Sequence, residues 1–151
     1  MALHWKLVID CTDAPALAEF WSEALGYALE DPSELVGSLL ASGRLDAAAV
    51  VERDGRKLFR GLSGIRHPED PHDAASGVGR GRRILFQEVP EAKVGKNRLH
   101  LDVHAGEAGL ESLVSRLETL GAVRVTEVDR GPAGHWWVMR DPEGNEFCAA
   151  G

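Results

Sequence analysis

A weak internal repeat constrains the fold of this 151-residue chain more than any other feature. Leu7-Val8-Ile9-Asp10 resembles Leu99-His100-Leu101-Asp102, and both segments are typical of strands with one apolar face. Each is followed by an amphipathic helix that ends in Leu-Gly, and then by further strands. The repeat predicts an α+β fold of two βαβββ modules that form one curved mixed sheet around a cup, with the helices on the convex side.

Both predicted helices have recognisable ends. Thr12-Asp13 followed by a proline predicts the start of a helix over residues 14–25, because a side-chain cap and a first-turn proline both suit an N-terminus. Gly26 supplies a left-handed C-cap. The second helix is expected from Glu107 to Leu120, and Gly121 ends it in the same way.

The middle of the chain is less regular. Ser33-Glu34 can cap a helix that closes at Gly43, and residues 53–56 resemble a hairpin turn, although the alanine-rich part before them is also compatible with a helix. Residues 61–81 are rich in Gly, Pro, Asp and His, which predicts a long loop. Strands are predicted at residues 3–11, 27–30, 82–89, 97–104, 123–128, 136–139 and 146–149.

The segment from Asn97 to His104 carries the first functional signal. If it is a strand, His100, Asp102 and His104 point away from the apolar face formed by its leucines and valine. A solvated face would explain any one of these polar residues alone. Three titratable side chains together favour a polar site on the sheet.

Composition narrows the class of partner. The net charge of −7 argues against a nucleic-acid backbone, and no apolar run is long enough to span a membrane. Two cysteines cannot form a disulfide framework, and no signal peptide is apparent, so we expect a cytoplasmic protein. The length suits one domain over residues 1–151, with a first module at 1–91, an insertion at about 32–81 and a second module at 96–151.

Three groups of motifs carry a resemblance to a known family. They are Asp10-Cys11-Thr12-Asp13-Ala14-Pro15 with Phe20-Trp21 and Leu25-Gly26, then Phe86 to Glu91 with Lys96 to Asp102, and finally Arg140-Asp141-Pro142-Glu143-Gly144-Asn145-Glu146-Phe147-Cys148. With these motifs the chain resembles the vicinal oxygen chelate superfamily, the glyoxalase and bleomycin-resistance proteins, most closely its glyoxalase-like branch. That superfamily contains lyases, isomerases, dioxygenases, thiol transferases and binding proteins, so the resemblance implies a fold and leaves the reaction open.

The resemblance also implies where a metal would bind. His100 falls at the position of the family's second-module histidine, and Gln87 suits the position of its Glu or Gln. The other two ligand positions fall on Lys6, whose ammonium cannot bind a metal, and on Cys148, which we expect to be a small buried residue. His4 and Glu146 have suitable side chains but lie two residues away, about 6.6 Å along each strand.

A shifted site would therefore use His100, Gln87, Glu146 and His4 around a divalent ion such as Zn, Ni, Fe or Mn. We expect instead that the metal site is degraded, with Lys6 as the counter-ion of Glu146 or Asp102. Asp102, His104, Gln87, Trp136 and Lys6 would then contact the ligand.

Two functions follow as expectations. The first is a protein that binds a small organic molecule in a metal-free cup, as bleomycin-resistance proteins do. The second is a divalent-metal-dependent lyase, isomerase or dioxygenase acting on vicinal oxygens, with His100 as base or ligand and Glu146 assisting. Members of the family commonly dimerise, so a homodimer is compatible with either function.

Overall fold

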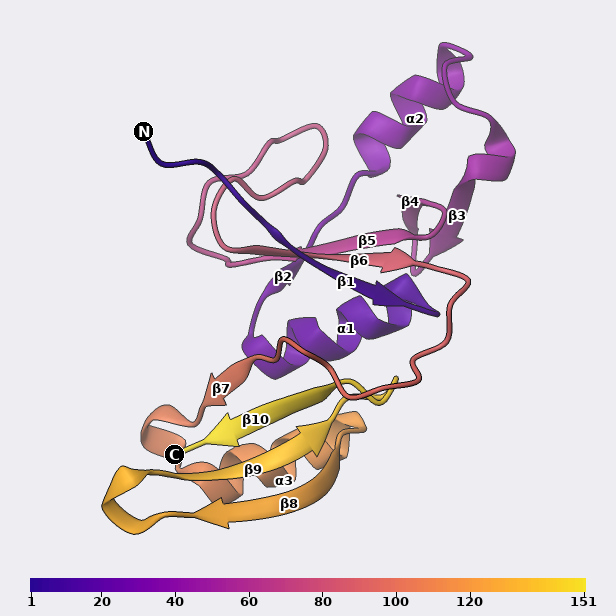
Figure 1. Cartoon of the computed structure of the whole chain (residues 1–151). Helices are drawn as coiled ribbons and strands as arrows, with labels where there is room; N and C mark the ends of the chain where they lie inside the picture. Colours follow the sequence, from indigo (N-terminus) through magenta and orange to yellow (C-terminus); the bar gives the residue numbers. More distant parts are fainter. The chain divides into compact units, whose positions relative to one another are not determined.

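The first half of the chain forms a four-stranded sheet in which the first and last strands are neighbours (Figure 1). The sheet contains β1 (Leu7–Cys11), β2 (Ala28–Leu29), β5 (Leu62–Arg66) and β6 (Arg83–Glu88) in the order β1-β6-β5-β2. β1 runs parallel to β6, and the other pairs are antiparallel. The computed structural model describes all residues from 1 to 151, which form two units, Met1–Pro90 and Glu91–Gly151.

Helix α1 (Ala14–Leu25) covers one face of this sheet, as its sequence predicts. The Asp13 side chain accepts a hydrogen bond from the Ala16 N–H at 2.9 Å, which caps the N-terminus. Gly26 adopts φ 66° at the C-terminus, a conformation that costs glycine little. Leu17 and Trp21 are buried with Phe86 of β6, so the core of the unit lies between helix and sheet.

An insertion separates β2 from β5. It contains α2 (Ser33–Ala41), a short 3-10 turn (Ala47–Ala49) and a hairpin of β3 (Val50–Arg53) and β4 (Arg56–Phe59). The hairpin is confirmed. Its two turn residues both have positive φ, as a two-residue hairpin loop requires.

The predicted loop over residues 61–81 was wrong at its start, because β5 occupies Leu62–Arg66. The small residues Ser63 and Gly64 conceal the alternation of that strand in the sequence. The rest of the stretch is indeed a loop, and it is held by ion pairs from Asp70 to Arg82 at 2.8 Å and from Asp73 to Arg80 at 3.1 Å.

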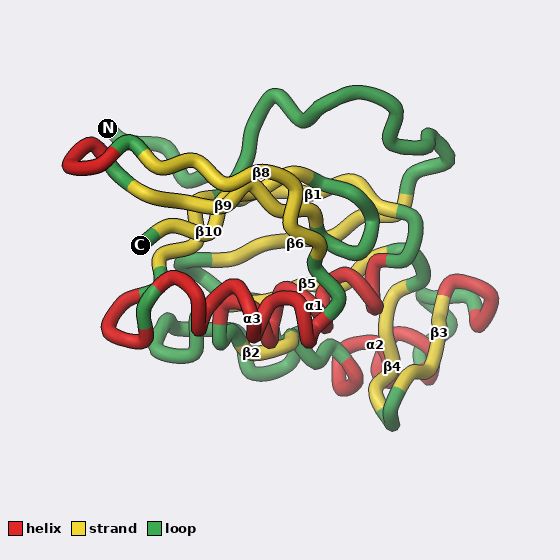
Figure 2. Tube along the Cα trace, turned by 90° about the horizontal axis from the view of Figure 1, so that it is seen from below, coloured by secondary structure: helices red, strands yellow, loops and turns green.

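The second half repeats the same topology. β7 (Asp102–His104), α3 (Leu110–Leu120), β8 (Val123–Asp129), β9 (His135–Arg140) and β10 (Glu146–Ala150) form a sheet in the order β7-β10-β9-β8. Again the first strand is parallel to the last. Figure 2 shows α3 along one side of this sheet. Two βαβββ modules are thus confirmed.

Three predicted boundaries in the chain were wrong. β1 begins at Leu7, so Leu3 and Trp5 lie outside the sheet with 86% of each residue exposed. β7 begins at Asp102, so Leu99 is 81% exposed and Leu101 only half-buried, and neither is a core residue. α3 begins at Leu110, because Gly109 has a φ of 80° that a helix cannot include.

No helix combines the length and apolar character that crossing a bilayer requires.

Candidate functional site

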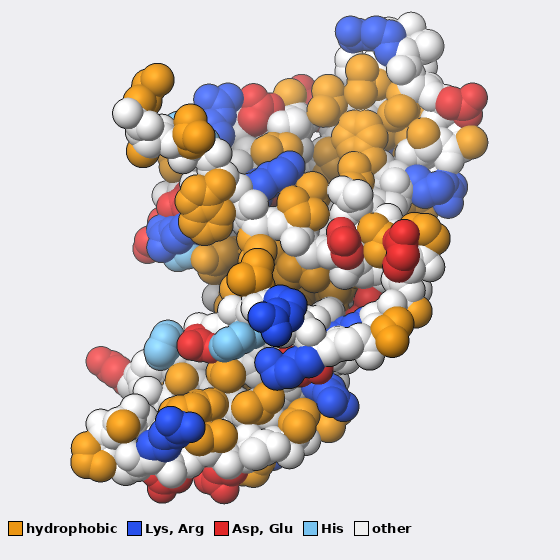
Figure 3. Space-filling view, in the orientation of Figure 1, with side chains coloured by type: hydrophobic (Ala, Val, Ile, Leu, Met, Phe, Trp, Pro, Cys, Tyr) orange, Lys and Arg blue, Asp and Glu red, His pale blue; other side chains and the backbone are white.

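The sheet of the second unit has one face packed on α3 and one face that α3 leaves open. Val103, Phe147 and Met139 alternate with the residues of the open face, and all three are buried with Leu117 of α3. The pairing register places the following residues on the open face: Asp102, His104, Trp136, Val138, Arg140, Glu146 and Cys148. We call this surface the open face of the second sheet. Figure 3 shows its histidine and acidic side chains in a row beside several Lys and Arg side chains.

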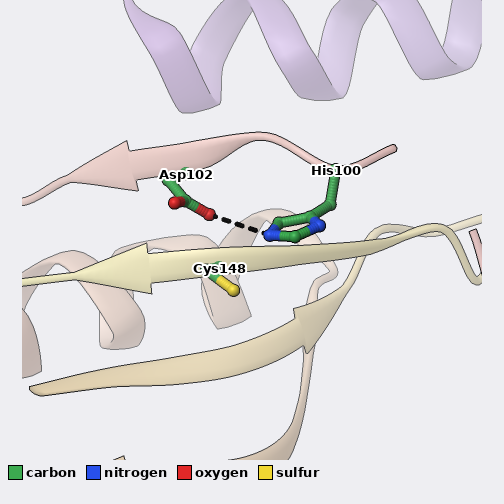
Figure 4. A group of neighbouring side chains, drawn as sticks. All are labelled: His100, Asp102 and Cys148. Carbon is green, nitrogen blue, oxygen red and sulfur yellow. Dashed lines mark ion pairs between the residues drawn. The ribbon is translucent and has the colours of Figure 1, made fainter. Parts of the chain in front are cut away.

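Three side chains converge at one end of this row (Figure 4). His100 precedes β7, Asp102 begins it, and Cys148 lies opposite Asp102 on β10. The ligand atoms of the three residues lie within 4.8 Å of one another, and His100 Nε2 is 3.3 Å from Asp102 Oδ1. His100 and Asp102 remain about half exposed, so a small molecule can reach the cluster.

Cys148 has an unusual environment. Partial burial raises the pKa of its thiol, and the neighbouring Asp102 carboxylate raises it further by charge repulsion and by accepting a hydrogen bond. The thiol is therefore protonated at neutral pH and is a poor nucleophile. Cys148 is only half-buried, so the expectation of a small buried residue was wrong.

The ligand atoms that the three side chains of the cluster offer suit a divalent metal ion. Imidazole, carboxylate and thiolate are the ligand types that Zn²⁺ accepts, and three protein ligands leave a fourth position for substrate. A bound cation would favour loss of the Cys148 proton. The expected metal set shares only His100 with this cluster, which draws all its residues from the second unit.

Glu146 lies on the open face and is bound by residues of the linker before β7, and its predicted part in catalysis or metal binding stays a prediction. It accepts a hydrogen bond from the Asn97 N–H at 3.0 Å and pairs with Lys93 Nζ at 3.0 Å, while Arg140 Nε lies 3.8 Å away. The Asn97 N–H and the Lys93 ammonium hold the pKa of Glu146 at about 2. Lys93 is thus a counter-ion of Glu146, and nothing in the sequence beyond its place in a basic linker points to it, while the pairing of Lys6 with Glu146 or Asp102 stays a prediction.

The first-unit residues expected at the site are all exposed. Gln87 lies on β6, on the sheet face that α1 does not cover, while His4 and Lys6 precede β1. Their participation in the site stays a prediction.

The two adjacent tryptophans face opposite sides of β9, as expected for neighbouring strand residues. Trp137 lies on the α3 side, where its Nε1 donates to Glu111 at 3.3 Å and the guanidinium of Arg124 lies 5.0 Å from its ring centre. Trp136 lies on the open face beside Arg130, whose guanidinium is 5.8 Å from the ring centre. Trp136 is thus the member of the pair that a ligand on the open face can contact.

Comparison with known proteins identifies the class. The sequence model of the glyoxalase-like domain family matches residues 6–150, so the chain belongs to this family, within the vicinal oxygen chelate superfamily. A search of curated proteins found no match.

Solved structures share the fold at low sequence identity. The hypothetical protein SA1046 from S. aureus is 12% identical, with a TM-score of 0.59 over 99% of this chain and 94% of that chain. A glyoxalase/bleomycin resistance protein/dioxygenase family enzyme from Burkholderia phytofirmans is 18% identical, with a TM-score of 0.54 over 96% and 94% of the two chains. A fosfomycin resistance protein, FosX, from Listeria monocytogenes is 10% identical, with a TM-score of 0.58 over 99% and 90%.

Proposed function

We propose that the chain binds a small organic molecule at the cluster of His100, Asp102 and Cys148 on the open face of the second sheet. The observation that carries the proposal is the convergence of three polar side chains on the face of the second sheet that α3 leaves open. Nothing in a strand face that only contacts water calls for a partly buried thiol beside an imidazole and a carboxylate, so this grouping supports a binding site. Trp136 and His104 extend the same face and offer an aromatic surface and a second imidazole.

Screening a library of small organic molecules by NMR tests this proposal. Ligands should shift the amide signals of residues 100–104 and 146–150, and His100→Ala should abolish those shifts. The matched control is His135→Ala, which removes a histidine paired with Glu127 at 2.9 Å on the same sheet. Hits that bind His100→Ala as well as the wild type would refute the proposed site.

The donor set of the cluster favours a second candidate, a divalent-metal-dependent enzyme. His100, Asp102 and Cys148 would hold the ion, which would act as a Lewis acid on two vicinal oxygens of a substrate. The Listeria FosX structure is described as complexed with manganese(II) and 1S,2S-dihydroxypropylphosphonic acid, so a metal and a small vicinal-oxygen compound both occur on this fold. In that case His100 would be a metal ligand and would not be available as a general base.

Cobalt(II) titration separates the two candidates. A thiolate ligand gives a sulfur-to-cobalt charge-transfer band, which Cys148→Ser should remove and Cys11→Ser should retain. Stoichiometric metal in protein purified without chelators, together with this band, would establish the enzyme candidate over the metal-free one. Protein that contains no metal and gives no band would exclude it.

We further propose a cytoplasmic homodimer. Cys11 and Cys148 are not joined in a disulfide, which supports a reducing compartment. Light scattering tests the assembly, with a mass of twice 16.3 kDa expected.

A further inference from the structure

The segment before β7 carries His100 but has few contacts that hold it to the sheet. Residues 91–100 are almost entirely exposed and form no helix or strand. Every hydrogen bond or ion pair that joins residues 91–99 to other parts of the protein ends on Glu146 or Asn145. The contacts that fix this segment are therefore concentrated at the start of β10.

Glu146 makes two of these contacts. Its carboxylate accepts a hydrogen bond from the Asn97 N–H at 3.0 Å and pairs with Lys93 Nζ at 3.0 Å. The Glu146 side chain is only 12% exposed, so water competes weakly for both interactions. Phe147 follows it on β10 and is fully buried, which fixes the backbone from which the Glu146 side chain projects.

Asn145 supplies a further contact to Asn97. Asn97 Nδ2 donates to Asn145 Oδ1 at 3.4 Å. Asn145 is itself held by the buried Asp141, because its N–H donates to Asp141 Oδ1 at 2.9 Å and its Nδ2 donates to Asp141 Oδ2 at 3.0 Å. Since the amide nitrogen of Asn145 donates to this carboxylate, its oxygen is left to accept from Asn97.

His100 lies between two anchored points of the chain. Asn97 is one of them, and Leu101 is the other, because its carbonyl accepts from the Cys148 N–H at 2.9 Å. Only residues 98–100 lie between the two, so the backbone of His100 has little freedom. Without the anchor at Asn97 the exposed segment would be free on that side, and ordering His100 at the cluster would cost conformational entropy.

We infer that Glu146 is a positioning residue, which holds the segment before β7 so that the His100 imidazole meets Asp102 and Cys148. The inference deepens the proposed function and rests on it, because it concerns the same cluster. Both contacts to the segment end on Glu146 Oε2, and Arg140 Nε lies 3.8 Å from Oε1. Each oxygen thus faces a positive charge, which disfavours a metal ion there.

NMR of the full-length chain tests the inference without any ligand. In the wild type, NOEs should join the His100 ring protons to the Cys148 Hβ protons, because the ligand atoms of the two residues lie within 4.8 Å. Glu146→Ala should remove these NOEs, since it releases the segment. Glu146→Gln keeps a side-chain acceptor for the Asn97 N–H and should retain them.

The matched control is Glu127→Ala, which removes a carboxylate that pairs with His135 at 2.9 Å on the same sheet. The NOEs between His100 and Cys148 should persist in this variant. NOEs that survive in Glu146→Ala, or that are lost in Glu146→Gln or in Glu127→Ala, would overturn the inference.

Hydrogen exchange of the wild type keeps the test valid if Glu146→Ala unfolds. The Asn97 N–H should exchange at least about tenfold more slowly than the N–H groups of Lys96 and Arg98, after correction for intrinsic rates, because neither neighbour donates to a partner. Equal rates would overturn the inference, since they would show that Glu146 does not hold the segment.

Failure of the inference and failure of the proposed function give different results. A wild type that shows the NOEs and the slow exchange but binds neither cobalt(II) nor a library compound would refute the proposed function and retain the positioning of His100. If cobalt(II) binds, Glu146→Ala should raise its dissociation constant about 10–100-fold, and Glu146→Gln should raise it less. An unchanged dissociation constant in Glu146→Ala would overturn the inference alone.

Discussion

Glu146 is held ionised by two donors of different kinds, a backbone N–H and an ammonium. Its pKa of about 2 lies below the ordinary value of 4.5. Because the folded-state pKa is lowered, the stabilisation is complete above about pH 4.5 and is lost as the pH falls towards 2. We expect Lys93→Met to raise the pKa of Glu146 but to leave it below 4.5, since the stronger effect of the Asn97 N–H remains.

Carbon-detected NMR of the Glu146 carboxyl group measures this pKa directly. Lys96→Met is the control, because it removes a lysine from the same linker without touching the pair with Glu146. An unchanged pKa in Lys93→Met would show that the ion pair does not form in solution.

Cys148 should react slowly with thiol reagents. Asp102→Asn removes the negative charge that raises the thiol pKa and replaces one carboxylate oxygen with an amide donor, so the pKa should fall and the reaction at pH 8 should accelerate. The rate is measured with a disulfide reagent in chelator, on a Cys11→Ser background that isolates Cys148. A slower or equal rate in Asp102→Asn would mean that Asp102 does not face the thiol.

At the scale of elements, truncating a leucine should affect the free energy of unfolding strongly in α3 and weakly in the segment before β7. Leu117 is fully buried, so Leu117→Ala should lower the free energy of unfolding by about 2–5 kcal/mol. Leu99 is 81% exposed, so Leu99→Ala should change it by less than about 0.5 kcal/mol. Urea denaturation of both variants measures the two losses, and equal losses would contradict the start of β7 at Asp102.

The same elements explain which parts of the fold were predictable. Capped helices and strands with large apolar residues, such as α1 and β6, were found because local sequence determines them. β5 was missed because Ser63 and Gly64 carry almost no pattern, and its pairing with β6 fixes it instead. Leu99 and Leu101 follow a strand pattern, but β10 pairs with residues 102–104. Leu101 joins the ladder only through its carbonyl, which accepts from the Cys148 N–H at 2.9 Å.

The candidate site was also predictable only in part, because local sequence patterns reveal some of its residues and strand pairing brings in the others. The polar trio pointed to His100 and Asp102. The family resemblance also placed Cys148 at a ligand position, but the side chain alone read as a small buried residue, and the register of β10 on β7 is what brings its thiol to the other two. Lys93 reaches Glu146 through the course of the linker, which no local pattern encodes.

At the scale of the whole molecule, the segment that follows Pro90 should be the first site of proteolysis. Residues 91–100 are almost entirely exposed and contain Lys96 and Arg98, whereas Arg80 and Arg82 are held by ion pairs in their loop. Limited trypsin digestion followed by mass spectrometry should show early cleavage after Lys96 or Arg98. Earlier cleavage after Arg80 or Arg82 would contradict the rigidity of that loop.

The parallel pairing of first and last strands has a consequence for the order of folding during synthesis. β1 pairs with β6, so Leu7 must wait for Ile84 to leave the ribosome, and the whole insertion lies between them. β7 waits only for β10, with one helix and one hairpin between. Closing the larger loop costs more chain entropy, so the unit that is made first has the slower sheet to complete. A nascent chain that stalls before β6 would carry β1 as an unpaired edge, which is the form most exposed to association with other chains.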